Sequence, residues 1–439
     1  MTLYFDEATE TMPREQLAAL QLKKLQVMLT EIYGRNRFYT TKFKQTGFQP
    51  GDLKSLADLA HLPLTTKTEL SQDQVAEGFA GTNLTYPLSA YTRYHQTSGT
   101  TGQPLRVFDT AESWDWWGKC WGHVFAGAGI TAHDRIFFAF SFGPFIGFWA
   151  AVEGARHIGA MLISGGGRSS VERLHLMNET GGTVLCCTPT YALHLLEVAR
   201  EHKIDVSTFN IQTTIHAGEP GANVPATKRR IETGWSAKCY DHAGASEVGA
   251  HSFECQAQPN GIHVVESEFI VEALDPTTHQ LVALGEKGEL VITNLGRWGF
   301  PVVRYRTGDA IIFNEARCDC GRTWLRLEGG VIGRVDDMIT IRGVNVFPSA
   351  IENLIRAYQM VDEFRVTASR RGELDELSIE VELVEGANAE LLSITLTQSI
   401  STRLGLRPQV SCVPRGTLPR FELKAKRFRI LDFSPSGDV

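Results

Sequence analysis

Cysteine is scarce in this chain, with eight in 439 residues. This frequency excludes a small scaffold held by disulfides and fits reduced thiols. The longest uncharged segment, residues 136–152, contains two glycines and a proline. It is shorter than the roughly 20 apolar residues of a membrane-spanning helix. The first residues include acids where a signal peptide has basic and then apolar residues. We therefore expect a cytoplasmic protein without a membrane span.

Basic residues are also in deficit, with 43 Lys and Arg against 50 Asp and Glu and a formal net charge of −7. This balance argues against broad electrostatic binding to nucleic acid or to an acidic membrane, although it allows a local basic pocket. A hydrophobic content of 43% is ordinary for a soluble globular protein. The length allows two or three domains with a substantial core.

The hydrophobic pattern divides most of the chain into regions of different architecture. Apolar positions at helical spacing between residues 17 and 32 predict an N-terminal amphipathic helix. Residues 134–219 alternate strand-like and helical segments, which predicts a parallel α/β sheet. The expected strands lie in RIFFAF, GAMLIS, TVLCCT and IQTTIHAG. Residues 263–313 instead predict a β-rich region with turns between its strands.

A second, smaller unit begins near residue 336. A helix after Pro348, two strands joined by a turn, a helix around residues 390–404 and a basic tail predict a small α+β domain. We therefore predict an α/β fold with a large N-terminal domain, residues 1–335, that contains both the parallel layers and the β-rich region. A small, mobile α+β C-terminal domain, residues 336–439, would follow.

A loop rich in glycine and hydroxyl groups, TSGTTGQP, occupies residues 97–104. It lacks the lysine that a P-loop requires, since only Thr100 and Thr101 separate Gly99 from Gly102 and no lysine follows. Its backbone amides and hydroxyl groups can still surround phosphate oxygens. Taken alone, the loop is equally interpreted as a polar turn between strands.

Four later segments favour phosphate binding as the function of this loop. In order along the chain they are YDHAGASEVG, VRYRTGDAI, GRVDDMITIRGVNVFPSAIE and GTLPRFELKAKR. With the loop, they resemble the phosphate loop, the Tyr-Gly-x-Thr-Glu segment, the ribose-binding segment, the hinge and the C-terminal lysine segment of adenylate-forming enzymes. PLTTKTEL, HAGEP and LPRFELKA resemble more narrowly the phenylacetate–CoA ligase family and its aryl–CoA ligase relatives. The resemblance covers essentially the whole chain.

The resemblance implies a two-step ligation that uses ATP, Mg²⁺ and coenzyme A. An aryl acid would form an acyl-adenylate and pyrophosphate, and the CoA thiol would then displace AMP. It implies that Glu247 ligates Mg²⁺, that Asp309 bonds both ribose hydroxyls and that Lys424 is the catalytic lysine. Asp336 would be the hinge. The other residues implied to bind ATP or AMP are Ser98, Gly99, Thr100, Thr101, Gly102, Gly218, Glu219, Pro220, Tyr240, Asp241 and Arg334.

One departure from the family occurs beside the catalytic lysine. The family usually has a glycine before this lysine, and the chain has Leu423 there. This difference leaves the local backbone undetermined. A solvated lysine in a basic tail is the other interpretation of Lys424.

The acid pocket is predicted from aromatic residues and histidines. Phe140, Phe142 and Phe145 fall in the family's aryl-pocket segment, with plain core packing as the other interpretation. His216 and His242 stand where related aryl ligases often have apolar residues. Because a buried histidine needs a partner, we expect one of them to bond an amino or hydroxyl group on the ring. With Gly244 also in this pocket, we predict a substituted benzoate such as anthranilate, with phenylacetate as the alternative.

A metal site is predicted apart from the ligation chemistry. Cys255, Cys318, Cys320 and His263 are three thiols and one imidazole, a set that suits tetrahedral structural Zn²⁺. The Cys-x-Cys spacing is less diagnostic than Cys-x2-Cys, and His251 is an alternative to His263. Reduced cysteines at turns are the other interpretation.

Two other functions remain open at this stage. The acyl group would pass to a carrier-protein phosphopantetheine or to an amine instead of free CoA, or the chain would be an inactive nucleotide-binding relative. The presence of Glu247, Asp309 and Lys424 argues against the inactive relative. A homodimer is an expectation from the family alone.

Overall fold

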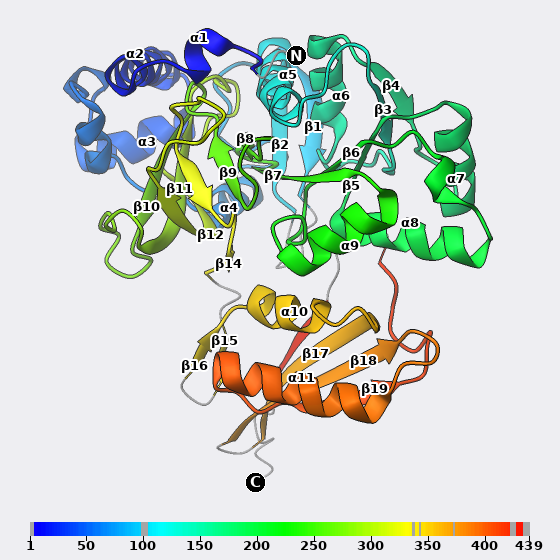
Figure 1. Cartoon of the computed structure of the whole chain (residues 1–439). Coiled ribbons are helices and arrows are strands. Elements are labelled where there is room, and N and C mark those ends of the chain that lie inside the picture. The colour runs from blue at the N-terminus through cyan, green and yellow to red at the C-terminus, as the bar shows by residue number, and fades with distance from the viewer. Residues whose placement is uncertain are drawn as a thin grey trace.

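A large N-terminal body and a smaller C-terminal body make up the chain (Figure 1). The computed structural model describes residues 4–97, 104–335, 339–341, 344–371, 374–421 and 427–432. The helices are α1 (Glu7–Glu10), α2 (Arg14–Ile32), α3 (Arg37–Thr46), α4 (Lys67–Ala76), α5 (Ala111–Gly127), α6 (Trp149–Ile158), α7 (Ser170–Glu179), α8 (Pro189–Glu201), α9 (Pro225–Trp235), α10 (Pro348–Arg356) and α11 (Ala389–Leu404). Short 3-10 turns lie at Pro50–Asp52, Leu56–His61, Leu88–Ala90 and Val206–Thr208.

The strands of the N-terminal body are β1 (Tyr91–Gln96), β2 (Arg106–Thr110), β3 (Arg135–Phe138), β4 (Met161–Ser164), β5 (Val184–Cys187), β6 (Thr213–His216), β7 (Lys238–Ala245), β8 (Gly249–Phe253), β9 (Gly261–Val264), β10 (Phe269–Leu274), β11 (Lys287–Asn294), β12 (Tyr305–Asn314), β13 (Arg326–Glu328) and β14 (Gly333–Arg334). Those that follow are β15 (Ile339–Ile341), β16 (Val344–Val346), β17 (Val361–Arg371), β18 (Leu374–Leu383), β19 (Gln409–Val413) and β20 (Phe428–Asp432).

Twelve of the described strands form one sheet through the N-terminal body. Its order is β10-β11-β12-β13-β9-β8-β7-β6-β5-β3-β4, and β14 pairs with β12. The strands from β4 to β7 are parallel, as the alternating pattern predicts, and β3 to β6 coincide with the expected runs. The β-rich region is confirmed as well. It continues the same sheet, because β7 pairs in parallel with β6 and antiparallel with β8.

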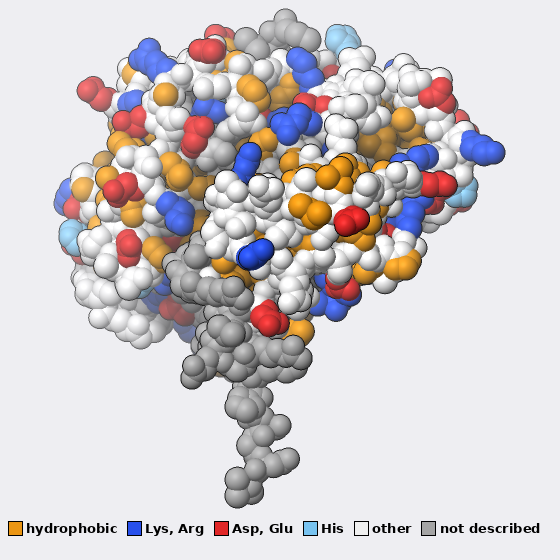
Figure 2. Space-filling view, turned by 60° about the horizontal axis from the view of Figure 1, so that its bottom comes forward, with side chains coloured by type: hydrophobic (Ala, Val, Ile, Leu, Met, Phe, Trp, Pro, Cys, Tyr) orange, Lys and Arg blue, Asp and Glu red, His pale blue; other side chains and the backbone are white. Residues whose placement is uncertain are grey.

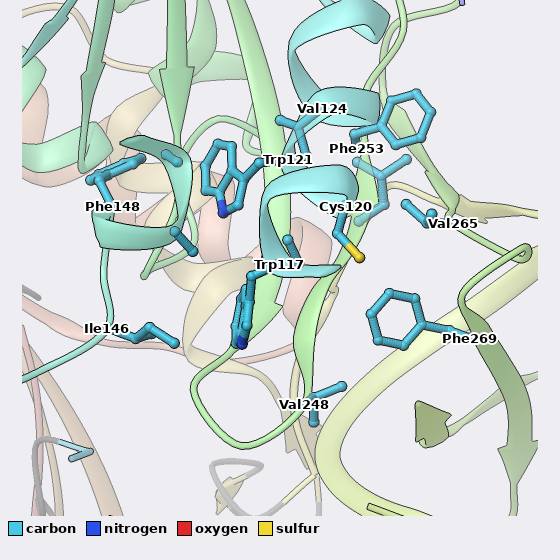
Figure 3. Close-up of a cluster of buried hydrophobic side chains, with 14 of the residues drawn as sticks. Trp117, Cys120, Trp121, Val124, Ile146, Phe148, Val248, Phe253, Val265 and Phe269 are labelled. Atoms are coloured by element: carbon cyan, nitrogen blue, oxygen red, sulfur yellow. The ribbon is translucent and has the colours of Figure 1, made fainter. Parts of the chain in front are cut away.

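Helix α5 forms the centre of the largest core cluster. Trp117 and Trp121 point toward Ile146 and Phe148, while the other side of the helix faces the β-rich strands (Figure 3). Glycines allow helix α6 to approach closely. A Cβ atom on Gly154 would lie only 2.3 Å from the Cβ atom of Trp121. The contact therefore excludes any larger residue at position 154.

The smaller body has its own sheet and its own core. Strands β17 and β18 form an antiparallel hairpin, flanked by β20 and β19 in parallel pairing. Buried apolar side chains of α10 and α11 belong to the same cluster as those of β17 and β18. The predicted helices and strands of this unit are confirmed. The predicted boundary at Asp336 lies outside the described residues and stays a prediction.

Polar contacts join the two bodies on the face of α8 and α9. Arg427 donates to Thr190 Oγ1 at 3.2 Å, and Arg230 donates to the Val361 carbonyl at 3.1 Å. Helix α10 lies next to α9 at this junction (Figure 1). Because polar and charged groups form these contacts, the junction can separate at little cost in exposed apolar surface.

The charge distribution is mixed on the face that Figure 2 shows. Basic and acidic side chains alternate over its described part, together with apolar ones. Within the described residues, no helix combines the length and the apolar character needed to cross a bilayer.

Candidate active site

Glu247 lies on the turn between β7 and β8 and is almost fully buried. Tyr305, on β12, donates a hydrogen bond from its hydroxyl group to Glu247 Oε1 at 2.6 Å. Burial and the Glu247 charge hold the pKa of Tyr305 well above its usual value, so the tyrosine stays a donor. Lys67, at the start of α4, places Nζ 3.7 Å from the same oxygen. A carboxylate with one oxygen fixed in this way is suited to ligate a divalent cation.

Asp309 and Arg334 face each other across the β12–β14 ladder. Arg334 Nη1 donates to Asp309 Oδ1 at 3.3 Å and to the Thr307 carbonyl at 2.9 Å. Gly308 makes this arrangement possible, since it has φ of +75° and a Cβ atom there would lie 2.5 Å from Arg334 Nη2. The predicted ribose-binding acid and the predicted arginine are therefore neighbours on one edge of the sheet.

The loop after β6 contains Gly218, Glu219 and Pro220. Gly218 adopts φ of +94°, a conformation that favours glycine. Glu219 accepts a hydrogen bond from the Thr190 backbone amide at 2.9 Å, in the first turn of α8, where a carboxylate complements the helix dipole. Asn223 fixes the end of this loop by donating to the carbonyls of Gly329 and Val331 at 3.3 and 2.7 Å.

Tyr240 and Asp241 complete this group on β7. Burial, and then the charge of nearby Glu254, raise the pKa of Asp241 to about 7, although Lys228 opposes the shift. A Cβ atom on Gly330 would lie 3.1 Å from Asp241 Oδ2. Asn223 also bonds residues beside Gly330, and the Ile332 amide donates to the Ala310 carbonyl at 2.9 Å, so the segments around 220, 241, 309 and 330 converge. The sequence had predicted three of these four segments.

His242 lies close to the predicted aryl-pocket segment. Its ring packs against Trp121 with centroids 4.3 Å apart, and Nδ1 donates to the Ser252 carbonyl at 2.7 Å. Burial lowers the pKa of His242 to about 4, so the ring is neutral near pH 7. Because Nδ1 carries the proton, Nε2 is an acceptor, and it accepts no hydrogen bond from another described residue. A Cβ atom on Gly244 would lie 3.3 Å from this nitrogen.

Aromatic rings connect His242 to the phenylalanines that the sequence singled out. Trp121 contacts Phe148, and Phe148 contacts Phe140, with centroid distances of 5.8 and 5.4 Å. Phe140 in turn contacts Phe142 and Phe145 at 5.5 and 5.0 Å. Phe140 is buried, whereas Phe142 and Phe145 are partly exposed.

His216 has a different environment on β6. It is fully buried. Its Nδ1 lies 3.0 Å from the Cys187 carbonyl, and its Nε2 lies 2.9 Å from Thr214 Oγ1. Burial lowers its pKa to about 4. Both ring nitrogens are thus occupied by the protein, so the geometry favours His242 over His216 as the residue that bonds a substrate group.

The four predicted metal ligands come together in one buried cluster. The ligand atoms of Cys255, His263, Cys318 and Cys320 all lie within 4.8 Å of one another. The Cys255 and Cys318 sulfurs are 3.5 Å apart, and Cys320 Sγ is 3.4 Å from His263 Nε2. A tetrahedral zinc ion with Zn–S bonds of about 2.3 Å needs sulfurs roughly 3.8 Å apart. His251 is excluded from this cluster and instead bonds Ser252 Oγ at 2.7 Å.

The cluster also contacts the N-terminal segment. The Tyr4 hydroxyl group donates to the Cys320 carbonyl at 2.6 Å, and Arg322 Nε donates to Glu10 at 2.6 Å. The Thr323 amide donates to the Glu10 carbonyl at 3.0 Å. The conformation of residues 318–324 therefore determines where the segment before α2 packs.

Several predicted site residues lie outside the described part of the chain. They are Ser98, Gly99, Thr100, Thr101, Gly102, Asp336 and Lys424. The base of the phosphate loop is described. There the Thr97 amide donates to the Leu105 carbonyl at 2.9 Å, and the Leu105 amide donates to Thr97 Oγ1 at 3.0 Å.

The sequence did not single out three residues that shape the site. Tyr305 lies in the VRYRTGDAI segment, four residues before Asp309, and this position could have identified it as a site residue. Lys67 likewise stands inside PLTTKTEL. Trp121 carried no such signal, because a tryptophan on a largely buried helix is usually a core residue.

Three features together define an adenylate-forming enzyme. They are a continuous sheet with a β-rich half, a separate small α+β unit, and the convergence of the predicted nucleotide-binding segments. A family model for the AMP-binding enzyme C-terminal domain matches residues 343–432. A phenylacetate-coenzyme A ligase of Thermus thermophilus is 30% identical over 98% of this chain and 99% of that protein. The Escherichia coli phenylacetate-coenzyme A ligase is 32% identical over 95% of each chain. The chain belongs to the phenylacetate–coenzyme A ligase family, which consists of AMP-forming acid–thiol ligases.

Solved structures of 2-hydroxyisobutyryl-CoA ligase relate the chain to two functional states. In its postadenylation state, that enzyme matches with a TM-score of 0.92 at 30% identity, over 98% of this chain and 92% of that one. In its thioesterification state, with CoA, the TM-score is 0.75 at 31% identity, over 98% of this chain and 93% of that one. Because the coverage is the same, the arrangement of the two bodies here resembles the postadenylation state.

Proposed function

We propose that this ligase activates a benzoate that carries a hydrogen-bond donor on its ring, such as anthranilate. The observation that carries this proposal is the fixed tautomer of His242. Its Nδ1–H group donates to Ser252, so Nε2 presents an acceptor beside Trp121. An amino or hydroxyl group can donate to that nitrogen, whereas unsubstituted phenylacetate has no donor on its ring. Phenylacetate is the second candidate, supported by the names of the relatives.

The nucleotide-binding residues have roles that follow from their positions. Asp309 would accept hydrogen bonds from the ribose hydroxyls at the strand edge where Arg334 bonds it. Tyr240, Asp241 and the loop at Gly218, Glu219 and Pro220 would line the adenine and acid sites. Glu247 would hold Mg²⁺, which neutralises phosphate charge during adenylation. The loop of residues 98–102 would surround the β and γ phosphates with amide and hydroxyl groups.

The two chemical steps use one acyl group and two nucleophiles. A carboxylate oxygen attacks the α-phosphorus, and the bond to pyrophosphate breaks. The CoA thiol then attacks the acyl carbon, loses its proton and displaces AMP. Lys424 would stabilise the charge that develops on the carboxylate and α-phosphate oxygens in the first step. The C-terminal domain, residues 336–439, would rotate about Asp336 between the steps.

The proposal also includes free CoA as the thiol acceptor and the cytoplasm as the location of the enzyme. The relatives are named as coenzyme A ligases, which supports CoA as the acceptor over a carrier protein. All eight cysteines are free, which fits a reducing cytoplasm that also supplies ATP and CoA. A homodimer is proposed from the family alone.

The acid is tested by ATP–pyrophosphate exchange with benzoate, anthranilate, salicylate and phenylacetate, followed by thioester formation with CoA. Anthranilate or salicylate should give the highest kcat/KM. Replacing His242 with leucine should then lower kcat/KM for that acid about five- to tenfold, since one neutral hydrogen bond contributes about 1 kcal/mol. The value for benzoate should change less. A clear preference for phenylacetate in the wild-type enzyme contradicts the proposal, and exchange without thioester formation favours a carrier protein.

We also propose that Cys255, His263, Cys318 and Cys320 bind one structural zinc ion. The spacing of the four ligand atoms supports it, and His263 Nδ1 lies 3.3 Å from the Trp324 carbonyl, which leaves Nε2 facing the sulfurs. His242 and Glu247 are not part of this cluster, so the ion would stabilise the fold and take no part in the ligation.

Zinc removal is expected to loosen the N-terminal segment. Replacing Cys318 and Cys320 with serine should abolish stoichiometric zinc and lower Tm by roughly 5 °C or more, because residues 318–324 position Tyr4 and Glu10. Elemental analysis and hydrogen exchange of residues 4–12 measure the two effects. Replacing the buried Cys186, which lies on β5, with serine is the matched control and should keep the zinc. Purified wild-type protein without zinc would refute the site.

A further inference from the structure

Two buried side chains hold the turn that carries Glu247. Arg297 Nη1 donates to the Ser246 carbonyl at 2.7 Å, and Asn294 Nδ2 donates to the Val248 carbonyl at 3.1 Å. These carbonyls belong to the residues immediately before and after Glu247. Both donors are fully buried. The backbone on each side of Glu247 is therefore fixed by a separate side chain, in addition to the bond from Tyr305.

Arg297 bonds a second element of the fold at the same time. Its Nε and Nη2 atoms each lie 2.7 Å from one carboxylate oxygen of Asp109 on β2. Neither side chain is exposed. The guanidinium group also lies 5.3 Å from the Trp117 ring and 5.5 Å from the Phe300 ring, which hold its plane in place. The rigid fork of donors lets a single arginine bond Asp109 and the Ser246 carbonyl together.

Asp109 belongs to the hairpin from which the phosphate loop emerges. Strands β1 and β2 pair antiparallel, and Asp109 stands opposite Arg93 in that pairing. The hairpin continues to Thr97 and Leu105, which bond each other at the base of the loop. Arg297 consequently links the two elements that are proposed to contact the triphosphate and its metal ion.

Burial of the Asp109–Arg297 pair is weak evidence for a gain in stability. Removing two charges from water costs several kcal/mol per ion, and an apolar pair of similar volume is often as stable. An apolar pair, however, bonds neither the Ser246 carbonyl nor the opposite strand. The specific property of the Asp109–Arg297 pair is thus the relative position of β2 and the Glu247 turn.

We propose that Arg297, oriented by Asp109, is a positioning residue for ATP activation: it fixes Glu247 relative to the hairpin of the phosphate loop. The inference rests on the proposed role of Glu247 as a Mg²⁺ ligand. Residues that orient metal ligands typically change metal affinity about 10- to 100-fold when they are replaced. A displaced Glu247 should therefore weaken binding of the metal with ATP before any chemistry takes place.

The test measures metal binding by electron paramagnetic resonance, with Mn²⁺ and the non-cleavable α,β-methylene-ATP. Combining Asp109→Leu with Arg297→Met replaces the buried pair by apolar side chains. This double variant should bind Mn²⁺ about tenfold or more weakly than wild type. Arg297→Lys keeps the charge beside Asp109 but loses the fork, and it should give an intermediate affinity. Thioester formation from preformed acyl-adenylate should keep its rate in both variants, because that step involves no triphosphate.

The matched control removes another buried pair of the same body. Glu10→Gln with Arg322→Met eliminates an ion pair whose nitrogen and oxygen are 2.6 Å apart, and it should lower Tm without changing Mn²⁺ affinity. The proposal is wrong if the control weakens Mn²⁺ binding equally, or if the double variant binds as wild type does. If the double variant does not fold, wild-type affinity in Arg297→Lys refutes it. Unchanged Mn²⁺ binding in Glu247→Gln instead refutes the metal role itself and this inference with it.

Discussion

Replacing Lys424 with alanine is expected to slow acyl-adenylate formation about 100- to 1000-fold, the range seen when a group that stabilises transition-state charge is removed. In the first step, negative charge is shared between the attacking carboxylate and the α-phosphate oxygens. A fixed ammonium group close to both lowers the energy of the transition state more than that of the separated reactants. The loss should therefore appear in kcat as well as in kcat/KM.

The same substitution should leave the second step nearly intact. The acyl-adenylate is already formed there, and the attacking group is a thiol. Supplying synthetic acyl-adenylate and CoA and following thioester formation separates the two steps. Lys426→Ala is the matched control, because it removes a neighbouring lysine of the same basic segment. An equal loss in both steps, or an equal loss in Lys426→Ala, contradicts the role of Lys424.

The contacts of the C-terminal body are consistent with this separation of steps. Arg420 and Arg427 stand on either side of residues 422–426. Arg427 donates to Thr190 of the large body, and Arg420 pairs with Glu197 at 3.6 Å. Thr190 is also the residue whose amide bonds Glu219. Arg420 and Arg427 thus both contact helix α8, and the contact of Arg427 lies beside Glu219 of the predicted nucleotide site.

Replacing Glu247 with glutamine is expected to lower the rate of adenylation about 100-fold at limiting Mg²⁺. Glutamine keeps the size of the side chain and can still accept the Tyr305 hydrogen bond, but it loses the negative charge that would attract the cation. Excess Mg²⁺ should restore part of the rate, because the defect is mainly one of metal affinity. Mg²⁺ titration of ATP–pyrophosphate exchange measures this effect.

The control for Glu247 is another buried carboxylate of the same body. Glu266 accepts a hydrogen bond from the Leu325 amide at 2.6 Å and pairs with Arg14. Glu266→Gln should reduce stability without shifting the Mg²⁺ dependence. Tyr305→Phe should give a smaller loss than Glu247→Gln, about tenfold, since it frees the carboxylate but keeps its charge. A Mg²⁺ dependence unchanged in Glu247→Gln would be incompatible with metal binding at this residue.

Local sequence was sufficient for part of the secondary structure. The alternation of apolar strands and helices predicted the parallel strands β3 to β6. Strands β3, β5 and β6 are largely buried and form short apolar runs, whereas β4 is a partly exposed edge strand. The sequence pattern also predicted α10, α11 and the β17–β18 hairpin. It did not show that the parallel and antiparallel strands share one sheet. That continuity depends on the pairing of β7 with both β6 and β8. The hydrophobic period of a strand does not show which other strand it pairs with.

Side-chain partners in the candidate site required the folded chain. The sequence could not choose between His251 and His263 as the fourth metal ligand, because both stand within ten residues of Cys255 in the chain. The structure brings only His263 to the three sulfurs. It likewise separates His216, bonded within the protein through both nitrogens, from His242, whose Nε2 accepts no bond from a described residue.

The sequence by itself determined the class of chemistry, since five short segments in a fixed order resemble those of adenylate-forming enzymes and contain the predicted nucleotide, metal and lysine positions. The predicted residues would act through their own functional groups, so their identity and order are readable without a structure. Only the tertiary structure decided how they are held. Asp109, Ser246 and Arg297 are remote in sequence and meet in a buried network, and Trp121 lies against His242 from a different helix. The physical reason is that such contacts depend on how layers pack, and a hydrogen bond between distant residues has no local pattern.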